Sequence, residues 1–278
     1  MATPFDHQIL ARHAFAVVDP AALEDLPEGM RSEALVPASL AASAHLMPRL
    51  IDLRTMTDER SGTLLESLHQ AHTSGQAPPI ALLVRAELDS KEFTGYWNAL
   101  QLAMPQPGQQ AWLRVHDPRV LHQLLRILNP AQRRKLFGRS AAFTYWVAGE
   151  WLTAQASDAV PTGGIAAWDW PRVERIGVVN RALQSAGVCD AAALSSQGAL
   201  AEQLIDRASA RHGLVSQADM VEFARRGLST RATFDEHPTV AASITPDADH
   251  GEDSTLADRF DLIDDDVWNE LRQPSNMQ

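Results

Sequence analysis

Three carboxylates and one imidazole stand where the sequence could support chemistry. Asp19, Asp52 and Asp117 each follow a short apolar segment, and His116 directly precedes Asp117. Carboxylate and imidazole groups are common ligands of catalytic metal ions, so these side chains could form the site of a small metal-dependent hydrolase. Each aspartate also stands where it could cap a helix or a turn, and the local sequence favours this structural interpretation.

Other catalytic patterns are missing from the sequence. It contains no glycine-rich phosphate loop, no Gly-x-Ser-x-Gly motif and no His-Glu-x-x-His motif. The single cysteine, Cys189, allows neither a disulfide framework nor a cysteine-based zinc site. The histidines show no spacing typical of metal ligands. We therefore expect a protein with no catalytic residues, no metal and no cofactor.

The clearest local pattern in the chain runs over residues 111–138. Alternating apolar residues predict a strand over 111–116, and Asp117-Pro118 is typical of a helix N-cap followed by proline at the first helical position. Asn129-Pro130 repeats the device and begins a second short helix, which Gly138 can end. The first helix presents one apolar stripe, formed by Leu121, Leu124, Leu125 and Leu128.

Short apolar segments alternate with helical patterns up to about residue 155. The segments predicted as strands are 13–19, 49–53, 80–84, 111–116, 143–147 and 151–153. Strands that alternate with helices are typical of α/β proteins. We therefore predict an α/β fold with a mostly parallel sheet layered with helices, and an antiparallel edge formed by the last two strands.

Composition divides the chain into four parts. A small, polar stretch with proline and two glycines, residues 154–164, separates an α/β domain over 1–155 from a smaller helical lobe over 165–234. Residues 235–253 are predicted to be a flexible linker. Residues 254–278 are predicted to be an acidic tail that contains an amphipathic helix.

The predicted linker and the acidic tail together carry most of the net charge of −11, because twelve acidic and two basic residues follow position 234. An acidic tail and a nearly neutral body do not favour nucleic-acid binding, and no apolar run is long enough to insert into a membrane. The predicted helix over 255–272 has large apolar residues at helical spacing: Leu256, Phe260, Ile263, Val267 and Leu271, with Trp268 beside them. Such a stripe must be buried, either on a partner or on the protein's own lobe.

Three blocks of the sequence resemble a known family. The segment LRVHDPRVLHQLLRIL, with Asn129-Pro130 and KLFG after it, is similar to the signature block of the type VI secretion adaptor/chaperone family, long described only as a domain of unknown function. Residues 143–146 resemble the aromatic strand that follows this block in the family. Residues 13–19 and 38–53 are similar to its opening strand and its helix–strand unit. The resemblance covers about residues 10–150.

For the signature turn we predict a structural role, in which Asp117 caps the helix and Arg119 or Arg114 makes a buried pair that fixes the turn. The residues of this turn are Arg114, Asp117, Pro118, Arg119, Phe137 and Gly138.

The resemblance also implies a function: a non-catalytic adaptor that binds a toxic type VI effector and helps to load it onto the VgrG spike. The alternatives are the metal-dependent hydrolase and a structural scaffold component of the secretion system. Because the N-terminus shows no signal peptide, we expect the cytoplasm of a bacterium as the compartment. Partner choice needs a variable surface, so we expect the effector to contact mainly residues 165–234 and the cleft that they form with the first domain.

Candidate partner-binding residues are the large apolar side chains of the lobe and of the tail. They are Trp168, Trp170, Phe223, Leu256, Phe260, Ile263, Val267, Trp268 and Leu271.

Overall fold

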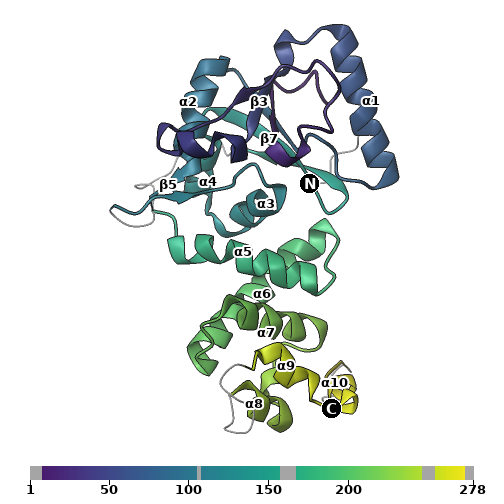
Figure 1. The fold of residues 1–278 in the computed structure, drawn as a ribbon, viewed down its shortest axis with the longest axis vertical. Coiled ribbons are helices and arrows are strands. Elements are labelled where there is room, and N and C mark those ends of the chain that lie inside the picture. The colour runs from purple at the N-terminus through teal and green to yellow at the C-terminus, as the bar shows by residue number, and fades with distance from the viewer. Residues whose placement is uncertain (1–7, 105–107, 157–166, 246–253, 273–278) are drawn as a thin grey trace. The chain divides into compact units, whose positions relative to one another are not determined.

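The computed structural model describes residues 8–104, 108–156, 167–245 and 254–272. The chain forms two compact units, Met1–Val173 and Glu174–Gln278. Figure 1 draws the first in purple to teal and the second in green to yellow. Helix α5 (Trp170–Ser185) begins in the first unit and continues into the second. Among the described residues, no helix is both long enough and apolar enough to cross a membrane.

The N-terminal unit contains a six-stranded sheet with the order β2-β3-β1-β4-β7-β8. Every neighbouring pair in this sheet is antiparallel. The prediction of a mostly parallel sheet is therefore wrong. The strands are β1 (Phe15–Val18), β2 (Glu33–Ala34), β3 (Arg49–Asp52), β4 (Leu82–Ala86), β7 (Ser140–Val147) and β8 (Glu150–Gln155).

The position of β1 explains the error. The chain passes from β3 through α1 (Asp58–Ser74) to β4, and both of these strands are antiparallel to β1. They therefore run in the same direction as each other, which is the relation that a strand–helix–strand pattern predicts. However, β1 lies between them in the sheet. A local sequence pattern cannot reveal that an earlier strand is inserted there.

The predicted strand over 111–116 is also wrong beyond its second residue. Only β6 (Ala111–Trp112) is extended, and it pairs with β5 (Leu102–Ala103) in a separate two-stranded sheet. Residues 113–116 form a turn, in which Asp117 N–H donates to the Arg114 carbonyl at 3.0 Å. Leu113 N–H still donates to the Gln101 carbonyl at 2.8 Å, whereas Val115 and Asp117 donate to Leu113 and Arg114, so the pairing ends after Leu113.

The predicted hairpin is confirmed as β7 and β8. They are joined at Ala148 and Gly149, whose φ angles are 51° and 81°. Two consecutive residues with positive φ are typical of the tight turns that match the twist of paired strands.

Helices pack on both faces of the large sheet, as Figure 1 shows for α1 and α2 (Ser90–Gln101). Side chains alternate between the two faces along each strand. Val18 belongs to a hydrophobic cluster with Leu64 and Leu68 of α1. Phe15 points to the other face and stacks on Phe93 of α2, with ring centroids 4.5 Å apart. The unit thus has a helix–sheet–helix arrangement.

A continuous row of aromatic rings connects α2 and α4 (Pro130–Phe137) to the sheet. From Phe15 and Phe93 it continues to Trp97 at 5.5 Å, then to Phe143 of β7 at 6.3 Å, and from Phe143 to Phe137 of α4 at 4.6 Å. All five side chains are fully buried. These distances are typical of favourable aromatic pairs, so the row fixes where both helices lie on the sheet.

The remaining elements of this unit are short. The predicted helix near residues 38–47 is a pair of 3-10 turns, η2 (Ala38–Leu46), which is interrupted by non-helical backbone at Leu40 and Ser43. The others are η1 (Pro20–Ala22), η3 (Leu53–Thr55) and α3 (Pro118–Ile127).

The C-terminal unit consists of helices around one hydrophobic cluster. They are α5, α6 (Ala191–His212), α7 (Gln217–Ser229), η4 (Phe234–Glu236), α8 (Pro238–Ile244), α9 (Leu256–Asp261) and α10 (Asp265–Arg272). The prediction of a flexible linker over 235–253 is wrong for its first part, since Val240 and Ile244 of α8 are 0% and 1% exposed. This helix was not predicted because its few apolar residues lie in a segment that is otherwise polar and contains prolines. Residues 246–253 lie outside the described residues.

The tail stripe is buried in this unit's own core. Instead of one long helix, the tail forms α9 and α10, separated by residues 262–264. Leu256, Phe260 and Leu271 are 0% exposed and share a cluster with Phe223 of α7. Arg259 is buried as well, and its guanidinium donates to the Ser243 and Ile244 carbonyls at the end of α8. The tail therefore completes the lobe, which was one of the two alternatives that the sequence left open.

Replacement of Phe260 by alanine tests this arrangement. Phe260→Ala should lower the free energy of unfolding by about 3–5 kcal/mol, because it leaves a cavity against Phe234 and Trp268. Leu262→Ala is the matched control, since Leu262 is 73% exposed, and it should change stability by less than about 0.5 kcal/mol. Chemical denaturation measures both values. Equal stability of the two variants would mean that the tail does not pack on the lobe.

Candidate functional site

The signature turn is held by Asp117. Its carboxylate accepts from the Arg119 backbone N–H at 3.0 Å as the N-cap of α3, and Pro118 occupies the first helical turn. The Arg119 side chain folds back and donates to the same carboxylate at 3.2 and 3.0 Å. Burial alone would raise the pKa of Asp117, but the hydrogen bonds and charge of Arg119, with the charge of Arg114, outweigh it and lower the pKa. Asp117 is therefore held as a carboxylate by its neighbours.

Arg114 pairs with a different carboxylate. Its guanidinium lies 3.5 Å from Asp19, which accepts from Ala21 N–H and caps η1. His116 Nε2 lies 3.6 Å from the same Asp19 carboxylate, and its ring stacks on Trp112 at 5.9 Å. The fold thus brings Asp19 and His116 together.

His116 is 3% exposed, and neither ring nitrogen has a hydrogen-bond partner among the described residues. Burial lowers the pKa of His116 to about 4, although the nearby Asp19 charge acts in the opposite direction. The imidazole is therefore neutral at physiological pH.

Asp52 belongs to another group of residues. Its carboxylate accepts from the Arg54 guanidinium at 2.9 and 2.7 Å and from the Ser90 hydroxyl at 2.6 Å. Burial raises the pKa of Asp52, but these hydrogen bonds outweigh burial and lower it. No group of three or more histidine, cysteine or acidic residues that could hold a metal ion occurs in the described part of the chain. The four candidates for a hydrolase site are thus divided between two groups, each with its own basic partner.

The end of the signature block has a packing role. Phe137 is buried in the aromatic row. Gly138 has φ +56°, and a Cβ atom added there would lie 2.4 Å from the Tyr96 ring. The Tyr96 hydroxyl donates to the Leu136 carbonyl. Glycine is needed at 138 because α2 and α4 approach closely at this point.

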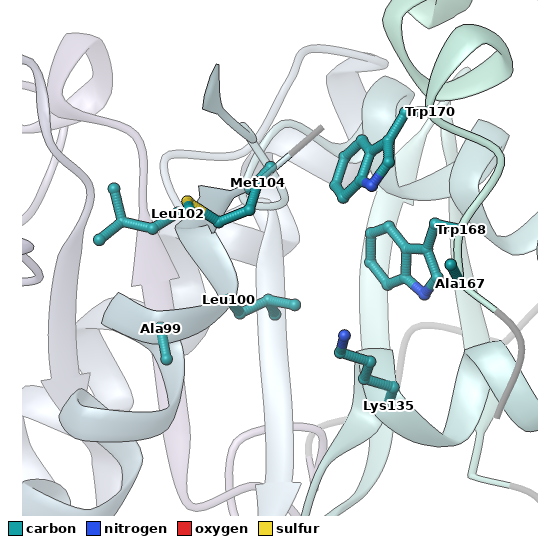
Figure 2. Close-up of a pocket in the computed structure, with 9 residues that line it drawn as sticks. Ala99, Leu100, Leu102, Met104, Lys135, Ala167, Trp168 and Trp170 are labelled. Atoms are coloured by element: carbon teal, nitrogen blue, oxygen red, sulfur yellow. The ribbon is translucent and has the colours of Figure 1, made fainter. Parts of the chain in front are cut away.

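Beside this contact lies an apolar pocket of about 300 Å³. One wall is formed by the end of α2 and the strand after it, with Leu100, Leu102 and Met104. The other wall is formed by Trp168 and Trp170, whose ring centroids are 5.6 Å apart. Figure 2 shows the two walls facing each other. The remaining lining residues are Ala99, Ala103, Lys135 and Ala167.

Local hydrogen bonds position the tryptophan wall. Asn129 and Gln132 form a capping box at the start of α4. The Gln132 side chain also donates to the Ala167 carbonyl at 2.8 Å, which ties the segment before Trp168 to α4. Trp168 is 8% exposed, whereas Met104 on the opposite wall is 53% exposed. The pocket therefore has a fixed aromatic wall and a more exposed, adaptable one.

The structure separates the candidate partner-binding residues into two sets. Trp168 and Trp170 line the pocket. The other seven belong to the C-terminal unit, where six are buried in the core and Val267 is partly buried against it: Phe223, Leu256, Phe260, Ile263, Val267, Trp268 and Leu271. The apolar stripe in the sequence predicts that these side chains are buried, but it does not predict which segment or partner covers them.

Sequence reasoning missed Leu100, Leu102, Met104 and Lys135 as pocket residues. Leu100 and Met104 match the apolar spacing of one helix face, but α2 ends at Gln101. Met104 therefore leaves the helix and reaches the pocket from the strand side. The sequence signal for the pocket was Met104, an apolar residue that continues the helical spacing but follows the end of the helix.

The fold is that of an α/β protein with an antiparallel sheet, joined to a helical lobe. Residues 14–135 match the model of a family described as "Domain of unknown function (DUF4123)". The match lies within the N-terminal unit. Comparisons with curated proteins and with solved structures found no match.

The Asp117 cap can be tested by substitution. Asp117→Ala removes the acceptor of the Arg119 N–H and should cost about 0.5–2 kcal/mol of stability, whereas Asp117→Asn keeps an acceptor and should cost less. Thermal denaturation measures the loss. Asp25→Ala, at an exposed aspartate outside the turn, is the control and should melt like the wild type. If Asp117→Ala also melts like the wild type, the cap does not stabilise the turn.

The buried His116 predicts a pH dependence. Its pKa is lower in the folded state, about 4, than the ordinary value of 6.5, so the unfolded chain binds more protons between these pH values. The contribution of His116 to stability is complete above about pH 6.5 and is lost as the pH falls toward 4. Unfolding titrations at several pH values should therefore show that His116→Gln loses less free energy of unfolding than the wild type as the pH falls from about 6.5 toward 4. His13 and His122 titrate in both proteins and cancel in this comparison. Parallel pH curves would contradict a neutral buried imidazole.

Proposed function

We propose that this protein is a non-catalytic adaptor that binds a type VI secretion effector and helps to load it onto the VgrG spike. The observation that carries the proposal is the apolar pocket of the N-terminal unit, in which two tryptophans that follow the residues matched by the family model face side chains within the match. An apolar, aromatic-lined concavity is typical of binding sites. The three sequence blocks that resemble the adaptor/chaperone family supply the biological context.

The contacts of Asp117 and Asp52 favour binding over catalysis. Asp117, in the signature turn, and Asp52, at the start of η3, are each hydrogen-bonded to a neighbouring arginine, and the two carboxylates have separate partners. A hydrolase would need such carboxylates to converge on one substrate or metal position. Here each carboxylate stabilises a turn.

Masking apolar surface is the physical role that we assign to the adaptor. An effector that must cross an envelope exposes apolar segments before delivery, and such segments aggregate when they stay in water. A pocket that holds one of them would lower that risk until the effector reaches the spike. The acidic character of the chain adds solubility to the complex.

Capture from the native bacterium tests the function. The tagged protein, isolated from cells with an active type VI system, should bring down one effector and a VgrG protein, identified by mass spectrometry. Deletion of the gene should stop secretion of that effector while other effectors and the tube protein are still secreted. Loss of all secretion would indicate a scaffold component instead. Recovery of neither effector nor spike would contradict the adaptor role.

A further inference from the structure

The pocket has one charged residue in its lining. Lys135 is exposed on α4, and its side chain in Figure 2 runs toward the space between Leu100 and Trp168. No carboxylate in the described parts of the chain pairs with its amine. Helix α4 carries no acidic residue, and the Arg133 guanidinium donates to the Leu125 and Leu128 carbonyls instead of lining the pocket. Lys135 thus places a positive charge in a lining that is otherwise apolar.

The aromatic wall has an unused donor. Trp168 is more than nine-tenths buried, and its indole N–H has no acceptor among the described residues. Figure 2 shows this nitrogen on the edge of the indole nearer to Lys135. A buried donor without an acceptor is unfavourable, so an occupant that brings an oxygen to this edge would gain a hydrogen bond as well as apolar contact.

The dimensions limit what can enter. A volume of about 300 Å³ lies at the lower end of ligand pockets, which suits one large side chain with its backbone rather than a whole helix. Met104, with 53% of its surface exposed, gains most from being covered. Apolar walls, the Lys135 ammonium and the Trp168 N–H without an acceptor among the described residues suit an occupant in which an apolar side chain stands next to an acidic group.

From these features we infer that the pocket binds an extended peptide segment in which a large apolar residue stands next to aspartate or glutamate. The apolar side chain lies between Trp168 and Met104, and the carboxylate pairs with Lys135. Trp168 N–H donates to a carbonyl or carboxylate oxygen of the segment. This inference rests on the proposed function, because the segment is taken to be part of the effector, and it adds the chemistry by which the effector is chosen.

A charge reversal with a matched control tests the inference. The chain has two lysines, Lys91 and Lys135, and both are exposed, but only Lys135 is a lining residue of the pocket. Random heptapeptides displayed on phage would be selected on the full-length wild type, on Lys135→Glu and on Lys91→Glu. The wild type and Lys91→Glu should enrich a large apolar residue next to Asp or Glu. Lys135→Glu should enrich the apolar residue next to Lys or Arg.

Affinity of one synthetic peptide gives the second measurement. The best acidic peptide from the wild-type selection should bind Lys135→Glu at least about tenfold more weakly, and Lys91→Glu within about twofold of the wild type. Met104→Asp should weaken it similarly, whereas Leu46→Asp, at an exposed leucine outside the pocket, should not. Added salt should weaken binding to the wild type.

Three results would overturn the inference: no enriched motif, an apolar motif without an acid, or the same motif for Lys135→Glu. These results leave the adaptor role to be decided by the capture from native cells, which uses the wild type. If the wild type captures no effector there while the peptide motif follows the charge at 135, the pocket chemistry stands and the proposed function fails.

Discussion

The row of aromatic rings from Phe15 to Phe137 is the interaction on which the N-terminal unit depends. It passes through β1, α2, β7 and α4, which are far apart in the sequence. Because each ring is fully buried, a shift of one helix would separate several stacked pairs at once. The row therefore fixes the end of α2 and the whole of α4, and these two helices carry Leu100 and Lys135 to the pocket.

Charged groups in this protein mostly hold turns and helix ends in place. Asp19, Asp52 and Asp117 each accept from a backbone N–H two residues ahead, and each also lies near an arginine. These contacts give each of the three carboxylates a structural role at a turn or a helix start. Lys135 differs from them, because it lines an apolar pocket and no carboxylate of the described residues pairs with it.

The C-terminal unit depends on its own tail in a similar way. Arg226 of α7 lies 4.5 Å from the Trp268 ring and pairs with Asp261 at 2.9 Å, so one side chain joins α7 to both tail helices. Arg259 joins α9 to the end of α8 through carbonyl acceptors. Planar guanidinium groups suit this role, since they stack on rings and donate in several directions. The acidic residues of α9, α10 and the turn between them are exposed on the outer side of the tail.

Local structure follows from neighbouring residues. The caps at Asp117 and Asn129, the hairpin at Ala148-Gly149 and the helical stripe of the tail depend on side chains and backbone within a few residues of each other. The direction of the strands depends on distant segments, since β1 enters between β3 and β4 from earlier in the chain. Packing between distant segments also buries the tail stripe in the C-terminal unit and places Met104 opposite Trp168 across a pocket. Spacing along a chain encodes which side chains share a face, whereas the partner of that face is chosen by packing among distant segments.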